Sequence, residues 1–257
     1  MSDEVLARRL IKVCAWTGVA FCVLFMIGSV PLARVFAPPY SAMHSAGQLQ
    51  AFYVHHLTGI RLGCFAMISA SALFLPFGLS IAAVVRKEDV AGRLLTWIQI
   101  ASVAVATVII LLIPVFWAVA SYRAGHTSPQ ITQSWNDAGW FCVLFTVPPF
   151  SVWCIAIALA ILRDTSPLAR VPRWVGYLNL WAAAIYVPSM LMIFFHHGAF
   201  SQNGLIAFWV PVGFFFVWIA TMTTVVIRAA NHTETIPPAH LDAPVPPPRA
   251  PAIAPPR

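Results

Sequence analysis

Histidines are the side chains of this sequence best suited to chemistry, because neutral imidazole binds zinc, copper and haem iron. Two adjacent pairs stand out among the eight histidines of the chain, His55 with His56 and His196 with His197. Neighbouring residues on a helix point about 100° apart, so one pair alone does not supply two ligands to one ion. The two pairs would have to converge to form a site. The pattern leaves three interpretations open: ordinary interfacial positions, a shared haem or metal site, and a pH sensor.

Charged side chains that catalyse reactions or carry ions are missing from the middle of the long apolar stretches. A charge at the centre of a bilayer costs about 2.5–3.5 kcal/mol on insertion scales, and chains that keep one usually use it. This pattern argues against proton-coupled transport through a buried carboxylate, a voltage sensor and a charged selectivity ring. The sequence also contains no Gly-rich phosphate loop and no HExxH or GxSxG motif. We expect a protein that is not an enzyme and that has no cofactor unless the histidines bind one.

The composition is that of a membrane protein. Of the 257 residues, 60% are hydrophobic and only 9% are charged, and the mean hydropathy is +0.82. Soluble domains contain roughly 25% charged residues. This difference excludes a soluble enzyme, a nucleic-acid-binding protein and a disordered protein as descriptions of the whole chain.

Long stretches without Asp, Glu, Lys or Arg define the expected membrane crossings. A spanning helix needs about 20 consecutive apolar residues. The last stretch, 174–227, is long enough for two helices and is interrupted by polar residues between 196 and 204. We therefore predict an all-α fold with one domain over 1–228. Its six transmembrane helices are expected at about 13–33, 61–85, 95–122, 138–162, 174–195 and 205–228.

The basic residues predict the orientation of these helices. Twelve of the 15 Lys and Arg residues lie in four segments, 1–12, 86–93, 163–173 and 228–257, which alternate with the expected outer segments. Only Arg34, Arg61 and Arg123 lie on the other side. Cytoplasmic segments carry the excess of basic residues in membrane proteins. We expect both termini to be cytoplasmic, in a multi-pass protein of the cell inner membrane whose positive charge meets anionic lipid headgroups rather than nucleic acid.

The end of the chain differs in composition from the rest. Residues 237–257 contain nine prolines and almost no residues that build a core. Such a composition favours extended, solvated chain. We predict a disordered cytoplasmic tail over 229–257. The alternative is a docking segment that recruits a cytoplasmic partner.

Prolines also occur within each of the predicted spans, at 31, 76, 114, 148, 149, 188 and 211. Each proline removes a backbone donor and kinks or breaks a helix. Most of them fall in the outer halves of the spans, so their kinks would open a funnel in the outer leaflet. The expected wall is mainly aromatic and uncharged, and suits a neutral hydrophobic or amphipathic ligand. Its candidate residues are Phe77, Trp117, Tyr186, Met190, Phe194 and Trp209.

Two charged residues lie near the outer ends of the second and fourth predicted helices. Asp137 is the only acidic residue of the outer segments, and Arg61 is the nearest basic residue at a comparable depth. Opposite charges close together form an ion pair, and an Asp just before a helix is a good N-cap. We expect Asp137 either to pair with Arg61 or to cap the fourth helix.

Three segments carry a resemblance to a known group of proteins. They are Trp135-Asn136-Asp137-Ala138-Gly139-Trp140, Val171-Pro172-Arg173-Trp174-Val175-Gly176-Tyr177 and Ala207-Phe208-Trp209-Val210-Pro211. These segments resemble an uncharacterised group of six-helix integral membrane proteins of bacteria, of the actinobacterial type. The resemblance implies a polytopic helical membrane fold. The group has no established activity, so the resemblance implies no site residue.

Taken together, these patterns favour an integral membrane protein that binds or passes a neutral small molecule through an outer-leaflet cavity. One alternative is a redox protein or oxidoreductase subunit, in which the two histidine pairs hold haem or a transition metal. A second alternative is an accessory or assembly subunit of a membrane complex. A homo-oligomer is compatible with each of the three.

Overall fold

All regular elements of the described residues are helices. The computed structural model describes residues 3–36, 44–166 and 169–232. The elements follow one another along the chain as α1 (Asp3–Ile27), η1 (Gly28–Leu32), α2 (Ala46–His55), α3 (Leu57–Ser71), α4 (Phe74–Val85), α5 (Val90–Tyr122), α6 (Pro129–Phe145), α7 (Val147–Leu162), α8 (Arg173–Ile185), η2 (Val187–Ile193), η3 (Leu205–Trp209) and α9 (Val210–His232). The tail predicted over 229–257 lies outside the described residues from 233 onwards.

Six helical segments among the described residues are long and apolar enough to cross a membrane. They are Asp3–Leu32, Leu57–Val85, Val90–Tyr122, Pro129–Leu162, Arg173–Ile193 and Leu205–Asn231. The prediction of six helices able to span a membrane is confirmed. The third segment begins earlier than predicted, because the Asp89 carboxylate accepts a hydrogen bond from the backbone N–H of Gly92 (3.2 Å) and caps the helix.

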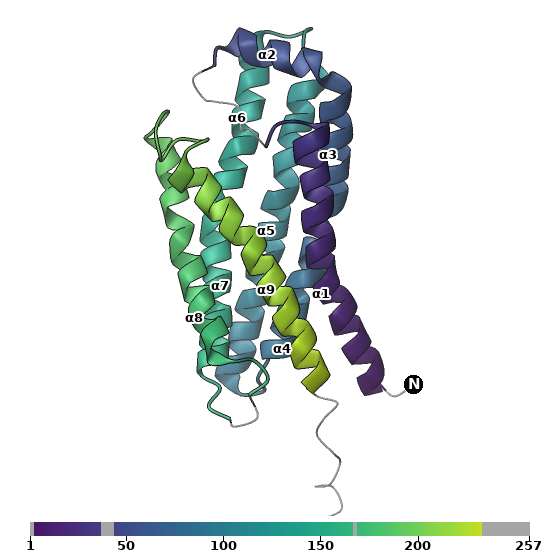
Figure 1. Cartoon of the computed structure of the whole chain (residues 1–257), viewed down its shortest axis with the longest axis vertical. Coiled ribbons are helices and arrows are strands. Elements are labelled where there is room, and N and C mark those ends of the chain that lie inside the picture. The colour runs from purple at the N-terminus through teal and green to yellow at the C-terminus, as the bar shows by residue number, and fades with distance from the viewer. Residues whose placement is uncertain (1–2, 37–43, 167–168, 233–257) are drawn as a thin grey trace, which may run out of the picture.

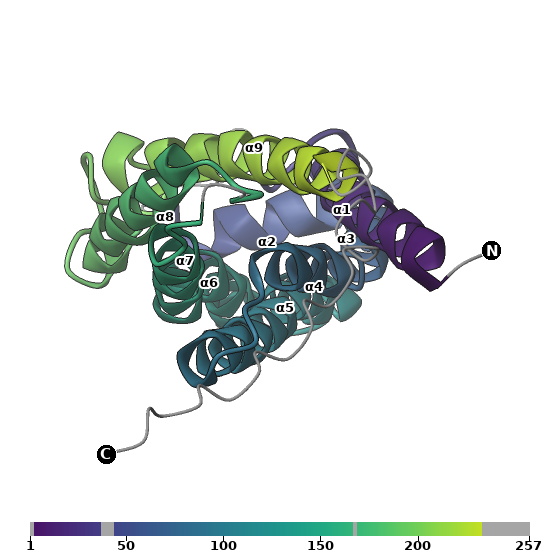
Figure 2. The same ribbon diagram turned by 90° about the horizontal axis from the view of Figure 1, so that it is seen from below.

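The six segments form an elongated bundle, and the short helix α2 lies across one end of it (Figure 1). α1 begins, and α9 ends, at the opposite end of the bundle. α9 is strongly tilted and crosses one face of the bundle at a slant, from α8 at its start to α1 at its end (Figures 1 and 2). The α2 end is called the capped end below, and the other the open end.

The capping helix α2 is fixed to the bundle by its own sequence. It begins with a capping box, in which Ser45 Oγ accepts from the Gln48 backbone N–H (3.3 Å) and Gln48 Oε1 accepts from the Ser45 N–H (2.9 Å). Leu49 and Tyr53 are buried beneath it, and the Tyr53 hydroxyl donates to Asn136 Oδ1 of α6 (3.0 Å). Burial raises the pKa of Tyr53 well above its usual value, so this hydroxyl remains a donor.

Each of the six spans contains a proline or a proline pair, and in five of them the regular helix is interrupted there. Pro31 lies in the π-helical turn η1, and Pro188 lies in the 3₁₀ helix η2. The breaks between α3 and α4 and between α6 and α7 precede Pro76 and Pro148, and η3 precedes Pro211. Only α5 continues as a regular helix through its proline, Pro114. A proline lacks an N–H and clashes with the carbonyl four residues earlier, so the helix changes about one turn before it.

Small residues and aromatic rings fill the bundle interior. A Cβ added to Gly18 of α1 would lie 2.5 Å from Phe77 Cδ2 of α4, so these two helices are in close contact. Gly139 of α6 packs in the same way against the indole ring of Trp117. Such close approach is how helices associate in lipid, where van der Waals packing replaces the hydrophobic effect.

Candidate ligand cavity

A partly open cavity of about 120 Å³ lies between the start of α9 and the helices that α9 crosses. Its walls come from the second halves of α1 and α5, from the α6–α7 junction, from the α8–η2 junction and from the start of α9. The second halves of α1 and α5 are those nearer the capped end, so the cavity lies from the middle of the bundle towards that end (Figure 1). All of its lining side chains are buried or half-buried.

Three of the proline interruptions meet at this cavity. Thr146 and Val147 line it at the break before Pro148, Tyr186 and Ser189 line it on either side of Pro188, and Pro211 lines it directly. Regular helices pack closely because their rows of side chains interdigitate at fixed spacing. A change of helix type shifts those rows, and three such changes around one point leave space that neighbouring helices do not fill.

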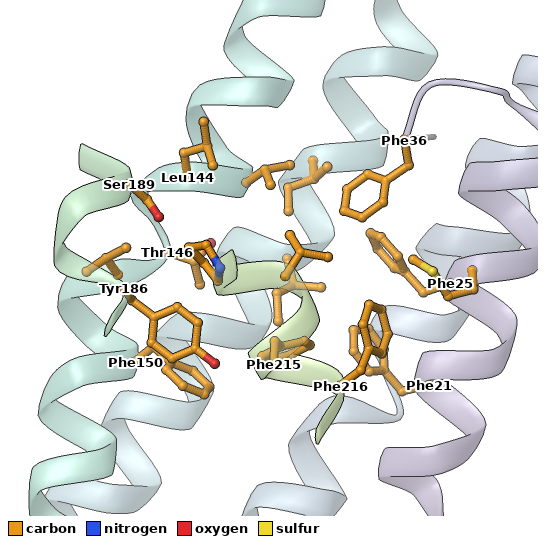
Figure 3. Close-up of a pocket in the computed structure, with 17 residues that line it drawn as sticks. Phe21, Phe25, Phe36, Leu144, Thr146, Phe150, Tyr186, Ser189, Phe215 and Phe216 are labelled. Atoms are coloured by element: carbon orange, nitrogen blue, oxygen red, sulfur yellow. The ribbon is translucent and has the colours of Figure 1, made fainter. Parts of the chain in front are cut away.

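Aromatic rings form one end of the cavity. Phe21, Phe25 and Phe36 lie on the α1 side (Figure 3). The ring centroids of Phe21 and Phe25 lie 5.5 Å apart, and those of Phe25 and Phe36 lie 6.2 Å apart in an edge-to-face arrangement. Rings arranged in this way form an apolar surface of defined shape. A flat or chain-like hydrocarbon group fits such a surface.

The opposite end of the cavity carries two hydroxyls, those of Tyr186 and Ser189 (Figure 3). Tyr186 is 6% exposed and Ser189 is 1% exposed. Neither Tyr186 Oη nor Ser189 Oγ has a hydrogen-bond partner within the described part of the chain. A buried polar group without a partner costs about 1–3 kcal/mol. The third hydroxyl of the wall, Thr146 Oγ1, donates to the Cys142 carbonyl (2.7 Å) and is satisfied within its helix.

Of the six residues predicted to form the cavity wall, Tyr186 lines this cavity. Phe77 and Trp117 are fully buried elsewhere in the bundle, and Trp117 Nε1 donates to the Asn136 carbonyl (3.3 Å). Met190 is half-buried against the core. Phe194 and Trp209 are 74% and 45% exposed on the outer surface of the structure.

The remaining wall residues were missed because the rotation of each helix about its axis is not evident from a nearly uniform apolar sequence. Two patterns in the sequence do indicate wall residues. Phe21 and Phe25 are spaced i, i+4 and share a helix face. The run Phe214–Phe216 follows Pro211 by one turn, and Phe215 and Phe216 line the cavity.

The structure does not bring the two histidine pairs together. His55 and His56 lie at the α2–α3 junction with ring centroids 4.7 Å apart. His196 and His197 are exposed in the segment between η2 and η3, on the opposite side of the capped end (Figure 1). In the described ranges, no three His, Cys, Asp or Glu side chains form a group able to hold a metal ion. Partial burial, followed by the nearby His55 and Arg34, lowers the pKa of His56.

Arg61 and Asp137 have separate partners. Arg61 Nη2 donates to the carbonyls of Ser121 (3.3 Å) and Tyr122 (3.1 Å), at the C-terminus of α5. A cation at this position satisfies free carbonyls and interacts favourably with the helix dipole. Asp137 lies inside α6, which begins at Pro129, and its Oδ1 accepts from Asn136 Nδ2 (3.3 Å). Arg61 therefore joins α3 to α5 rather than to α6.

Comparison with protein families, with curated proteins and with solved structures finds no match to this chain. The resemblance of its fourth to sixth helices to a bacterial membrane protein group stays a prediction.

Proposed function

We propose that this multi-pass membrane protein binds or passes a neutral hydrophobic or amphipathic small molecule through the cavity behind α9. The single observation that supports the proposal most is the cavity itself, an apolar space with two unpaired hydroxyls inside a closely packed bundle. Ligand sites are commonly concave, mostly apolar pockets that contain a few polar groups. A partly open cavity with this composition is therefore a candidate binding site.

The wall limits the chemistry of the ligand. No Asp, Glu, Lys, Arg or His is among the lining residues, so a charged ligand would lose its hydration without a compensating partner. The volume limits its size. An engineered apolar cavity of about 150 Å³ in another protein binds benzene, so about 120 Å³ suits one small ring or a similar length of chain.

The proposed orientation places both termini in the cytoplasm and the capped end outside, in the inner membrane. The basic residues of segments 1–12, 86–93 and 163–173 lie towards the open end, where they would meet anionic headgroups (Figure 1). The cavity then lies between the midplane and the outer leaflet. Binding rather than catalysis is proposed, because the polar groups of the wall are hydroxyls without an adjacent base.

The cavity is tested by filling it. Fluorobenzene is titrated into lipid nanodiscs that contain the protein and followed by ¹⁹F NMR, with empty nanodiscs as the reference for partition into lipid. We expect saturable binding to the protein. Ile113→Phe places a ring in the cavity and should abolish this binding, whereas Ile155→Phe, on an exposed face of α7, should leave it unchanged. Fluorobenzene binding that is absent, or equal in the two variants, would contradict the proposed function.

A further inference from the structure

We propose that Arg34, His55 and His56 form a binding site for a phosphate group at the capped end. The three side chains line an open hollow of about 340 Å³ at the corner where α2 meets α3 (Figure 1). This hollow shares no residue with the ligand cavity. The inference therefore goes beyond the proposed function and does not depend on it.

The charge around the hollow has one sign. Arg34 is always protonated, and the two histidines gain positive charge as the pH falls. None of the described residues that line the hollow is acidic. The pKa of His56 is lowered by partial burial and then by the charges of His55 and Arg34, so these three basic groups lie close enough to repel one another. An anion in the hollow would relieve this repulsion.

The backbone of Arg34 is fixed while its side chain stays available. Ala33 N–H donates to the Gly28 carbonyl (2.9 Å), and Val35 N–H donates to the Ser29 carbonyl (3.1 Å). Ala33 and Val35 are both buried, whereas Arg34 is exposed between them. Its guanidinium has no ion pair or hydrogen bond to another described residue. A guanidinium on a fixed backbone is well suited to bind an oxyanion through two parallel hydrogen bonds.

The two imidazoles are held at the corner between the helices. The ring centroids of His55 and His56 lie 4.7 Å apart, and the His56 ring also packs edge-to-face with Phe52 (5.0 Å). The hydrogen bond from Tyr53 to Asn136 fixes the end of α2 that carries them. The His56 side chain does not cap α3, and the positive end of this helix dipole adds to the field of the three side chains.

The arrangement of donors favours phosphate over carboxylate. Arg34 follows η1, His55 ends α2, and His56 lies between α2 and α3, so the donors come from different parts of the chain. A carboxylate has two oxygens in one plane. A phosphate group has a tetrahedral set of oxygens, which accept hydrogen bonds from several directions. This group is either free in solution or part of a lipid headgroup, and the chemistry that binds it is the same.

The histidines make the affinity depend on pH. A bound anion stabilises the imidazolium form and raises the histidine pKa, so by linkage anion affinity rises as the pH falls through the histidine range. Other charged or titratable groups occur on the elements around this corner. They are His44 before α2, Arg61 of α3, Arg123 and His126 between α5 and α6, and Asp137 of α6.

Sulfate is the first probe, because it is tetrahedral like phosphate but keeps its charge at neutral and mildly acidic pH. The full chain is kept in maltoside micelles, which contain no phosphate, and sulfate is titrated by isothermal calorimetry at constant ionic strength. We expect saturable binding that is at least about tenfold tighter at pH about 5.5 than at pH about 8. Absence of saturable binding would overturn the inference.

Variants locate the site. Arg34→Gln should weaken sulfate binding at both pH values by at least about tenfold. The double variant with His55→Gln and His56→Gln should abolish the pH dependence and keep the affinity of the unmodified protein at pH about 8. Arg123→Gln and His126→Gln are the matched controls, because both residues are exposed at the capped end but lie outside the hollow. Equal losses in the Arg34 and Arg123 variants would overturn the inference.

A second pair of probes identifies the source of the phosphate. Inorganic phosphate is compared with dioctanoyl phosphatidate, a short-chain lipid that carries the same group. Equal affinities support a site for free phosphate, and tighter lipid binding that Arg34→Gln weakens supports a site for a headgroup. Lipid binding that this variant leaves unchanged would contradict the site. None of these results affects the proposed function, which is tested separately with fluorobenzene.

Discussion

Ion pairs between single residues connect the two loops at the open end. Arg163 Nη2 donates to Asp89 Oδ2 (2.7 Å), and Lys87 Nζ lies 2.7 Å from Asp164 Oδ2. The loop between α4 and α5 is thus joined to the segment that follows α7. Surface ion pairs contribute little individually, but Asp89 also caps α5, so its ionisation affects both features.

The first prediction concerns Asp89 and acid. The hydrogen bond from Arg163 holds the pKa of Asp89 below its usual value of 3.8. A lowered pKa means that the stabilisation is present above pH about 4 and is lost as the pH falls through the folded-state value. Asp89→Asn keeps a capping oxygen and removes the charge. We expect its melting temperature to fall less than that of the unmodified protein between pH 6 and pH 3.

Melting is followed by circular dichroism in detergent, over this pH range. Glu4→Gln is the control, because Glu4 is exposed and lies 3.8 Å from Arg8 in a single-helix pair. Its melting curves should follow those of the unmodified protein. Parallel pH profiles for Asp89→Asn and the unmodified protein would refute the role assigned to this pair.

At the scale of helices, some features could be predicted from the sequence and others could not. Runs without charge define the six spans, because a charge in hydrocarbon is costly at any rotation of the helix. The wall of the cavity depends on helix rotation, and nearly every residue in these spans is apolar. Tyr186 lines the cavity at the break before Pro188, where the helix changes. Phe194, which was expected in the same wall, lies beyond η2 and faces outwards.

The histidine pairs show a second limit of the sequence. Their depth was predictable from the spans, but which helices are neighbours was not. α3 and α8 lie on opposite sides of the bundle, so pairs at similar depth do not meet (Figures 1 and 2). Interhelical contacts in lipid come from packing of small residues and rings, and these leave weak patterns in a sequence where apolar residues dominate.

The second prediction concerns the contact between α1 and α4. Gly18→Ala would place its Cβ 2.5 Å from Cδ2 of the fully buried Phe77 ring, so the ring or the helix must shift. Overpacking of this kind costs about 1–3 kcal/mol. Gly213→Ala in α9, where no atom lies within 4 Å, should instead stabilise the helix by about 0.5–1 kcal/mol. Unfolding in mixed micelles measures the change in the free energy of unfolding for each variant. Changes of the same sign in the two variants would contradict the close contact between α1 and α4.

At the scale of the whole molecule, the even number of crossings places the start of α1 and the end of α9 at the same end (Figure 1). This arrangement agrees with the four basic segments of the sequence, which alternate with the segments of the capped end. The third prediction is that the open end faces the cytoplasm.

Cysteine labelling tests this orientation. In a background without the five native cysteines, His197→Cys at the capped end should react with a membrane-impermeant maleimide in intact cells. Glu88→Cys, between α4 and α5, should react only after the membrane is permeabilised. Both positions are exposed in the structure, so access to the reagent depends on the side of the membrane. The reverse pattern would invert the proposed topology.

The position of α2 has a consequence for how any ligand arrives. This helix lies across the end of the bundle nearest to the cavity, and its buried Tyr53 fastens it to α6. A molecule approaching from the solution at the capped end therefore meets this helix first, whereas one already dissolved among the lipid tails would meet only α9 and its flanks. Occupancy of the cavity would then depend on how strongly a compound partitions into the bilayer. Of two compounds with equal affinity for the cavity, the one more soluble in the bilayer would bind at the lower total concentration.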